Sequence, residues 1–436
     1  MSTASLQLTS DHTAAAATAS ATTGVMAVVA PYGTGSHYQA EVAATGWGCV
    51  AVTTPEEQLP PMYRGHLDES GYRQVVVHNG DLQATARTLA SLGVTAIVAG
   101  TEIGVPLAEI LAHRLGLPGN DPRTSDLRRD KGAMAAALKQ VGLDAPRSLS
   151  TDRLRDALAW AAQQEDCDEF VLKPADSGGS DGVFFCTSPD DITAAWHHLH
   201  GIPNALGGDN GHLILQERLR GMQHVVNSVS AVDAGGTPRH TFTEIWADHR
   251  IGHVYDRLDL RRPNRLVPKL LADYTARVLD VLGITTGPAH TEVMYARRRG
   301  PVLIETGNRP EGSYPVLAMR KATGSDHIRD AVHAAITGRP ERLSHPDPNT
   351  FVTKVSLISP GDGAFDEERL QQLLDLPTVR GHVGALTTGT RVTRTVDLLT
   401  SPGRLLLASD DAHAITKDHA AIRQLEKDGL YSGDPR

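Results

Sequence analysis

Two glutamates in the second half of the chain, Glu292 and Glu305, have the setting of a metal-binding pair. Each follows a short run expected to be a strand, and the basic turn Ala296–Gly300 separates the two runs. If the runs form antiparallel strands around that turn, the two carboxylates face each other. Opposed carboxylates repel, and Mg²⁺ would neutralise them because it prefers carboxylate and phosphate oxygens. Solvated glutamates at a sheet edge are the alternative.

Two residues that follow Glu305 extend this chemistry. Arg309 would place a guanidinium beside the metal carboxylates, which suits a transferring phosphoryl group with charge spread over its oxygens. Asn308 could add a neutral oxygen ligand. Ordinary solvation of a surface loop is the alternative for Arg309.

A cation and a glycine-rich loop stand together earlier in the chain. Lys173 ends the apolar run Phe170–Lys173, and the loop Asp176–Val183 follows it. An ammonium on a strand beside backbone N–H groups that glycine leaves accessible is a good clamp for phosphate. Lys131, at the start of a helix, is a second cation. Ordinary turn chemistry is the alternative.

The segment Gln216–His224 joins two expected strands through Gly221. Such a hinge exposes backbone N–H and C=O groups that can read the edge of an adenine. The hinge alone does not indicate an adenine site. Its position after the lysines and before the glutamates is what supports that interpretation.

The elements before residue 123 form a strand and helix alternation that predicts a small parallel α/β domain. Its turn Gly33-Thr34-Gly35 invites a dinucleotide interpretation, but a G-x-G-x-x-G motif needs glycine at position 38, which is Tyr38. A nicotinamide-dependent oxidoreductase is therefore a weak alternative. The expected strands are Gly24–Ala30, Cys49–Val52, Arg73–Val77 and Val94–Ala99, and the expected helices are His37–Ala44, Ala84–Leu92 and Val105–Leu115.

The rest of the chain mixes helices with hairpins, and from about Pro346 it is rich in strands and turns. The charged stretch His249–Arg262 is expected to be a solvated loop, with substrate contact as the alternative. The expected helices are Asp130–Val141, one from Pro189, Pro268–Leu282 and Ile415–Lys427. The expected strands are Phe170–Lys173, Val183–Cys186, Leu213–Gln216, Val225–Ala231, His240–Ile245, His290–Tyr295, Pro301–Glu305, Phe351–Leu357, Gly384–Leu386, Thr390–Arg394 and Arg404–Ser409.

Bulk properties limit the class of protein. A chain of 436 residues, at roughly 100–200 residues per domain, holds several domains. The net charge of −9 and the 4% of aromatic residues argue against a nucleic-acid partner. The three cysteines do not form a disulfide framework, which favours a cytoplasmic location. Residues 1–24 are expected to be a disordered tail rather than a signal peptide, and no apolar stretch is long enough for a membrane span.

The order of these features resembles the ATP-grasp superfamily, and within it the bacterial L-amino-acid ligases that make dipeptides. The resemblance runs from about Val25 to the C-terminus. It implies an α/β (α+β) fold with a Rossmann-like pre-ATP-grasp domain at 25–123. A central ATP-grasp domain follows at 124–345, with a mobile lid at about 145–220, and then a β-rich C-terminal subdomain at 346–436. A homodimer is a further implication.

The resemblance also implies roles for single residues. Two Mg²⁺ ions, for which Mn²⁺ can substitute, would lie on Glu292 and Glu305, with Asn308 as a further ligand. The catalytic residues would be Arg309, Glu292 and Lys173. The substrate would contact His290, Arg309, Gly312 and Ser313. ATP would contact Lys131, Lys173, Ser177, Gly178, Gly179, Ser180, Gln216, Glu217, Leu219, Gln223 and His224.

Some positions depart from the family pattern. Gln223 stands where relatives often have a glutamate near the ribose, and Asn308 is displaced by one residue from the usual asparagine. Ser313 stands where some dipeptide ligases have a bulky aromatic residue, which favours a roomier acyl pocket.

The expected reaction joins a small carboxylate, such as an amino acid, to an amine through an acyl phosphate, with release of ADP and phosphate. Specialised peptide or amino-acid-derived metabolites are the expected products. A carboxylase-like or purine-pathway-like ATP-grasp reaction is one alternative, and a nucleotide-binding protein without turnover is another.

Overall fold

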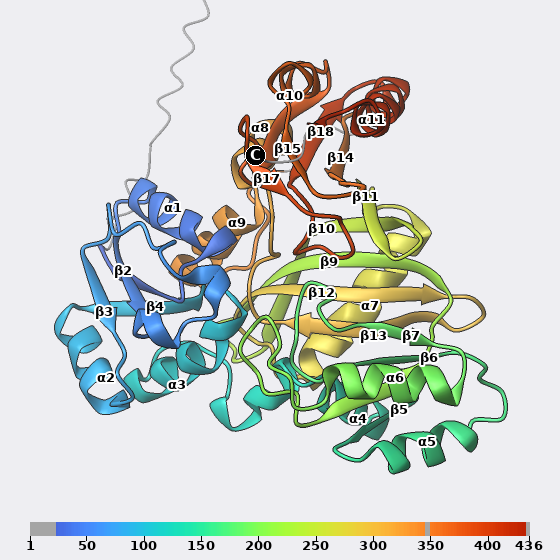
Figure 1. Cartoon of the computed structure of the whole chain (residues 1–436). Helices are drawn as coiled ribbons and strands as arrows, with labels where there is room; N and C mark the ends of the chain where they lie inside the picture. The colour runs from blue at the N-terminus through green and yellow to red at the C-terminus, as the bar shows by residue number, and fades with distance from the viewer. Residues whose placement is uncertain (1–22, 345–348, 433–436) are drawn as a thin grey trace, which may run out of the picture.

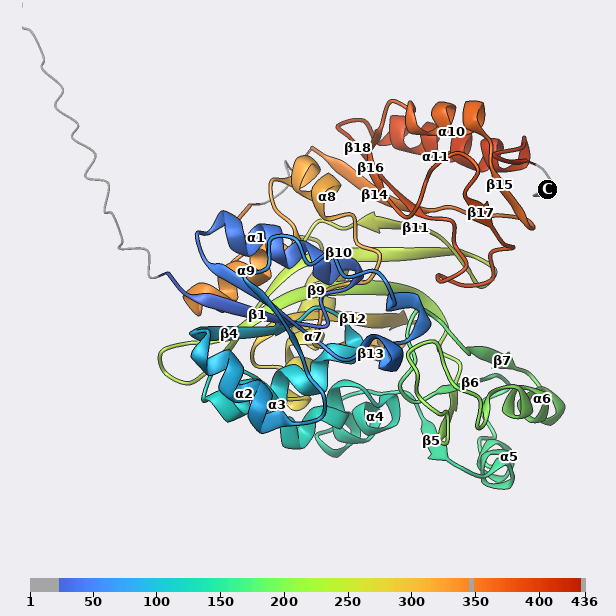
Figure 2. The same cartoon turned by 60° about the vertical axis from the view of Figure 1, so that its left-hand side comes forward.

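The computed structural model describes residues 23–344 and 349–432, so nearly all of the predicted N-terminal tail lies outside the described residues. Figures 1 and 2 show an N-terminal α/β unit, a small helix-covered sheet and a C-terminal group of helices, all arranged around one large antiparallel sheet. Every helix in the described part of the chain is too short or too polar to cross a bilayer.

The N-terminal unit is a parallel four-stranded sheet in the order β3-β2-β1-β4. Its strands are nearly continuous apolar runs because helices cover the sheet. Gly35, in the turn after β1, packs on Gly100 so closely that a Cβ would lie 2.5 Å from the Gly100 carbonyl oxygen. The strands are β1 (Val25–Val29), β2 (Gly48–Thr53), β3 (Gln74–Val77) and β4 (Val94–Ala99), and the helices are α1 (Tyr38–Ala44), α2 (Leu82–Ser91) and α3 (Val105–Leu115).

A second sheet is antiparallel and has the order β5-β8-β6-β7, and its strand β6 carries Lys173. Helices α5 (Leu154–Ala162) and α6 (Pro189–Leu199) pack on it through a core that includes Phe170, Leu172 and Trp196. The strands are β5 (Ser148–Thr151), β6 (Phe170–Pro174), β7 (Phe184–Cys186) and β8 (Leu213–Glu217), and α4 (Lys131–Gln140) precedes them.

The large sheet has the order β13-β12-β9-β10-β11-β14-β18-β16. On one face, α7 (Leu266–Val281) packs against Val226 and Val293. The sheet's first five strands in this order are β13 (Gly300–Gly307), β12 (Gly287–Ala296), β9 (Gly221–Val232), β10 (Pro238–Ile251) and β11 (Val254–Leu260), followed by β14 (Phe351–Ser356), β18 (Arg404–Ser409) and β16 (Val379–Val383).

The remaining elements flank this sheet. Helix α9 (His327–Thr337) packs against α1 and β9 and so joins the N-terminal unit to the sheet. A three-stranded sheet in the order β17-β15-β19 lies in the C-terminal region (Figure 2). The elements not yet located are α8 (Val316–Thr323), α10 (Glu367–Leu374), α11 (Ala412–Lys427), β15 (Gly363–Phe365), β17 (Arg391–Val392) and β19 (Tyr431–Ser432).

Two local predictions are wrong. The stretch His249–Arg262 is not a solvated loop, because it holds the end of β10 and the whole of β11 inside the sheet. Its buried charge Asp256 is paired with Arg423 and with His419, 2.8 Å away. The strand expected at Gly384–Leu386 is also absent there, since β16 ends at Val383 and Gly384 has a φ of +107°.

Candidate active site

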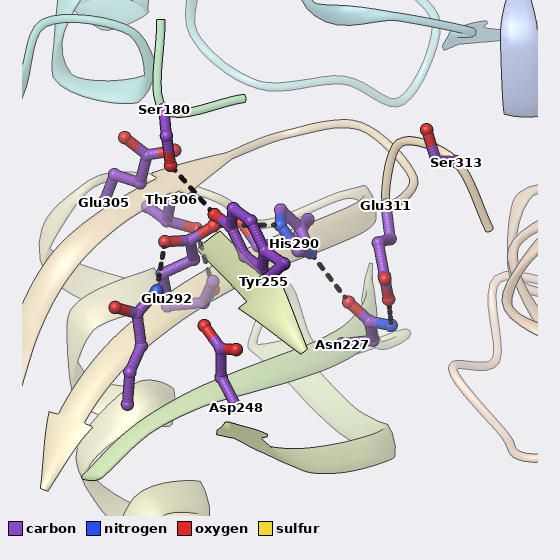
Figure 3. Close-up of polar contacts among 12 residues, drawn as sticks. Ser180, Asn227, Asp248, Tyr255, His290, Glu292, Glu305, Thr306, Glu311 and Ser313 are labelled. Atoms are coloured by element: carbon purple, nitrogen blue, oxygen red, sulfur yellow. Dashed lines mark hydrogen bonds and ion pairs between the residues drawn. The ribbon is translucent and has the colours of Figure 1, made fainter. Parts of the chain in front are cut away.

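A cleft of about 690 Å³ lies between the small antiparallel sheet and the large sheet. It is lined by both lysine positions, the glycine-rich loop, the hinge and both glutamates of the sequence prediction. Figure 3 shows where the glycine-rich loop meets the large sheet, with Ser180 standing over Tyr255 of β11, close to Glu292. The Ser180 Oγ and the Tyr255 hydroxyl lie 3.0 Å apart, which ties the loop to the large sheet.

The two glutamates occupy opposed positions, as their spacing predicted. Glu292 on β12 and Glu305 on β13 are direct cross-strand partners. Glu292 accepts a hydrogen bond of 2.7 Å from Gln223 Nε2, and Lys131 Nζ lies 3.1 Å from Glu305. Burial would raise the pKa of Glu292, but His290 and the nearby cations outweigh it and hold the pKa below its usual value.

The two lysines converge on this pair from the other side of the cleft. Lys131 begins α4, and its ammonium also donates a 2.6 Å hydrogen bond to the Ser177 carbonyl. Lys173, at the end of β6, is buried. Burial and the neighbouring Lys131 lower the pKa of Lys173 to about 8. A buried ammonium next to a second cation is a strong site for an anion.

The hinge residues offer backbone rather than side-chain groups. The Glu217 carboxylate is held by Arg147 and by Arg299, whose Nη1 lies 2.7 Å away. Gly221 is required where β9 meets β12, because a Cβ there would lie 2.1 Å from the Tyr295 carbonyl oxygen. Gln216, Glu217 and Leu219 all line the cleft, so the hinge can present its main chain to a planar ring.

Gln223 and His224 lie on opposite faces of β9 because side chains alternate along a strand. Gln223 faces the cleft, with Asp248 of β10 and Met294 of β12 beside it in register. His224 is paired with Val293, which packs under α7, and burial lowers its pKa to about 4. Gln223 therefore lines the cleft, as expected, and His224 does not.

A second cavity of about 210 Å³ adjoins the cleft, and Gly178, Glu292 and Glu305 border both. His290, Arg309, Gly312 and Ser313 line it, as does Gly179, which faces this cavity instead of the cleft. Loops of the N-terminal unit, the glycine-rich loop and Leu398-Leu399 of the C-terminal region complete its wall.

Arg309 is fixed at the boundary between the N-terminal unit and the large sheet. Its Nε donates a 2.8 Å hydrogen bond to Glu102, which lies just after β4. His290 is oriented by Asn227, whose Nδ2 donates to Glu244 and Glu311. The Asn227 Oδ1 must then accept from His290 Nδ1, 3.0 Å away, and His290 Nε2 faces Glu292.

Asn308 is not among the residues that gather at the cleft. Its Oδ1 accepts a 2.6 Å hydrogen bond from Asn120, and its Nδ2 donates to the carbonyls of Thr286 and Pro288. It lines neither cavity. Because Asn308 lies outside both cavities and its amide oxygen already accepts from Asn120, the structure gives no support to its expected role as a metal ligand.

Several residues of the site escaped prediction from the sequence. Arg250 and Tyr255 come from the stretch His249–Arg262, which was expected to be a loop, and Asp248 lies between that stretch and the expected strand His240–Ile245. Burial raises the pKa of Asp248 to about 6, and its Oδ1 has no hydrogen-bond partner among the described residues. Glu102 and Arg404 lie too far along the chain from the motifs for spacing to reveal them.

Comparisons with known proteins agree with this architecture. No protein-family model matches the chain. It is 28% identical to dapdiamide A synthase of Enterobacter agglomerans, over 94% of this chain and 97% of that protein. The structure of an L-amino acid ligase from Bacillus licheniformis matches with a TM-score of 0.70 and 15% identity, over 93% of this chain and 97% of that one. The ADP complex of the N5-carboxyaminoimidazole ribonucleotide synthetase purK matches with a TM-score of 0.68 and 12% identity, over 93% and 97%.

The chain has the ATP-grasp fold. The predicted α/β class and the resemblance to ATP-grasp enzymes are confirmed. The ATP-grasp fold places the opposed glutamates and the two lysines on facing walls of one cleft.

Proposed function

We propose that this protein is an ATP-dependent ligase that joins the carboxylate of an amino acid or small acid to an amine, with an acyl phosphate as intermediate. The observation that carries the proposal is the junction of the two cavities at Glu292 and Glu305. A triphosphate in the cleft would end where a carboxylate in the smaller cavity begins. The similarity to dapdiamide A synthase and to an L-amino acid ligase supports amide formation over other ATP-grasp reactions.

ATP would occupy the larger cleft. The adenine fits the hinge Gln216–Leu219, and the ribose fits the row formed by Gln223 and Asp248. Lys131, Lys173 and the backbone of Ser177–Ser180 would hold the phosphates, since these groups form the cationic end of the cleft. Backbone N–H groups in a glycine-rich turn suit phosphate oxygens.

Glu292 and Glu305 fit a site for Mg²⁺, with two ions as the expected number. When the lysines turn to the phosphates, the two opposed carboxylates lose cationic partners, and a hard divalent cation shared with phosphate oxygens restores the balance. Magnesium supplies charge neutralisation of the phosphates and their alignment.

The reaction proceeds in two steps. A carboxylate oxygen of the donor forms a bond to the γ-phosphorus, and the bond from that phosphorus to the β–γ bridging oxygen breaks, which releases ADP. The amine nitrogen then forms a bond to the acyl carbon, the bond from that carbon to the phosphate oxygen breaks, and the proton that the amine gives up leaves with the released phosphate. Arg309 would stabilise the transferring phosphoryl group, and the loop Ser177–Gly182 would exclude water from the acyl phosphate.

The experiment is a screen of amino-acid pairs with ATP and Mg²⁺, read by ADP release and by the mass of the product. The proposal predicts ADP release that requires both an acid and an amine, with a product lighter than their sum by one water. ADP release that requires bicarbonate and no second amino acid would favour a carboxylation reaction instead. Nucleotide binding without turnover for any pair would contradict the ligase function.

A further inference from the structure

The wall of the smaller cavity contains an arginine that the reaction described above does not use. Arg404 begins β18, and its side chain is 5% exposed. It lines the cavity together with Arg309 and Ser313. Its nearest anion is Glu311, and the contact is long, at 3.3 Å from Nη1 to Oε1.

Glu311 is already neutralised by another residue. Lys354, which is fully buried on β14, donates a 2.5 Å hydrogen bond to the same Oε1. The second oxygen, Oε2, accepts a 2.8 Å hydrogen bond from Asn227. Two buried cations therefore share one carboxylate, and the shorter contact belongs to Lys354. The positive charge of Arg404 is therefore only partly neutralised by Glu311.

The guanidinium of Arg404 also has an unused donor. Its Nε is buried, yet it has no hydrogen-bond partner in the described part of the chain. A buried donor without a partner and a buried cation without a full counter-ion are both costly, so such a group is retained where a ligand completes it. The ligand that matches the fork of an arginine is a planar anion with two oxygens, which is a carboxylate.

We propose that Arg404 binds the carboxylate that the reaction leaves intact, the α-carboxylate of an amino acid that serves as the amine substrate. This inference rests on the proposed ligase function. The reacting carboxylate of the donor must lie at Glu292, Glu305 and Arg309, where the two cavities meet, so it cannot also occupy Arg404. The intact carboxylate at Arg404 would direct the amino group toward the acyl phosphate.

The apolar part of the same wall indicates which type of side chain the amine substrate carries. Leu206, which precedes β8, and Leu398 and Leu399 of the C-terminal region line the cavity. A Cβ on Gly179 would lie 3.3 Å from Leu399 Cδ2, so the glycine-rich loop and the C-terminal region lie close together on this wall. An amine substrate with an aliphatic side chain fits this wall, because that side chain would be buried against leucines.

The first test uses the unaltered protein. With a donor and ATP held constant, KM is measured for an aliphatic amino acid, for its carboxamide and for the amine without any carboxyl group. We expect the KM of the amino acid to be lower than that of either analogue by at least about tenfold, as a charge-assisted bidentate contact implies. Equal KM values for the acid and the carboxamide would overturn the proposal while leaving the ligase function intact.

The second test uses substitutions. Arg404→Gln should raise KM for the amino acid at least about tenfold while changing KM for the carboxamide less than about threefold, and Arg404→Lys should recover part of the loss. Arg391→Gln, on β17 and outside both cavities, is the matched control. Equal losses for the acid and the carboxamide in Arg404→Gln would show a structural role only.

A third arm separates the two substrates. If the rise in KM of Arg404→Gln instead depends on a second carboxylate of the donor, Arg404 binds the donor. The assignment to the amine substrate is then wrong. Absence of turnover in the unaltered protein with every pair would overturn the proposed function itself, and with it this role of Arg404.

Discussion

Glu292 and Glu305 are direct cross-strand partners, but the groups that contact them differ in charge: the Lys131 ammonium lies 3.1 Å from Glu305, whereas the neutral amide of Gln223 lies 2.7 Å from Glu292. Lys131 is also a candidate phosphate ligand. Nucleotide binding would therefore draw Lys131 away from Glu305. The two glutamates would then lack that counter-charge, which favours binding of a metal cation between them.

Glu305→Gln should lower the ATP-dependent turnover at least about a hundredfold, since the loss of one preorganised group that stabilises transition-state charge costs on the order of 10²–10³ in rate. The apparent Mg²⁺ affinity should fall as well, which a titration of turnover against Mg²⁺ measures. Glu165→Gln, on an exposed turn, is the matched control. A variant at position 305 with normal turnover and normal Mg²⁺ dependence would remove the metal assignment.

Lys173 makes nucleotide binding depend on pH. Burial lowers its pKa to about 8, and a bound phosphate would raise that pKa again because it favours the charged form. Binding of ADP at pH near 8 should then be accompanied by proton uptake, which calorimetry in buffers of different ionisation enthalpy detects. The uptake should be absent in Lys173→Arg, whose side chain stays charged. Equal apparent enthalpies in all buffers for the unaltered protein would contradict this role.

Asp248 lies beside Gln223 in the row of residues where we place the ribose, and its Oδ1 has no partner in the described residues. Asp248→Asn should raise KM for ATP about tenfold, because a hydrogen bond to a charged group contributes about 1.5 kcal/mol or more. With 2′,3′-dideoxy-ATP the two proteins should differ little. Asp168→Asn is an exposed control. An equal rise in KM for both nucleotides would contradict a contact with the ribose, because it would show that the substitution acts on folding or on phosphate binding.

Arg309 and Glu102 connect the N-terminal unit to the site. Arg309→Ala should abolish amine-dependent ADP release while leaving ADP affinity within about threefold, because the guanidinium would act on the transferring group rather than on the bound nucleotide. Glu102→Gln should show a milder loss in kcat, since it only positions Arg309. Normal kcat in Arg309→Ala would remove it from the catalytic groups.

The sequence was sufficient for the hairpin that carries the two glutamates and for their opposed positions. The exact register could not be obtained by counting from the turn Ala296–Gly300, because a β-bulge between Glu292 and Val293 shifts the pairing by one residue and so places Glu292 opposite Glu305. The alternation of side chains along β9, by contrast, separates two residues that were both expected at the nucleotide. Because β9 begins at Gly221, Gln223 and His224 must point to opposite faces, and only Gln223 reaches the cleft.

The residues that sequence reasoning missed depend on the tertiary structure. The hairpin of β10 and β11 carries charges that are neutralised by distant residues, such as Asp256 by Arg423, so its polarity looked like that of a loop. Arg404 enters the cavity only because the sheet brings β14 and β18 next to the strands that carry the site. Asn308 was drawn into the prediction by its position after Glu305, and its partner Asn120 lies far away in the sequence.

The central claim, activation of a carboxylate by phosphorylation, is tested most directly by following the oxygen atoms of the donor. A donor amino acid labelled with ¹⁸O in its carboxylate is turned over with ATP and an amine substrate. We expect ADP and inorganic phosphate as products, with one ¹⁸O atom in each phosphate released. Label found in AMP, or phosphate free of label while the amide forms, would contradict the acyl-phosphate route.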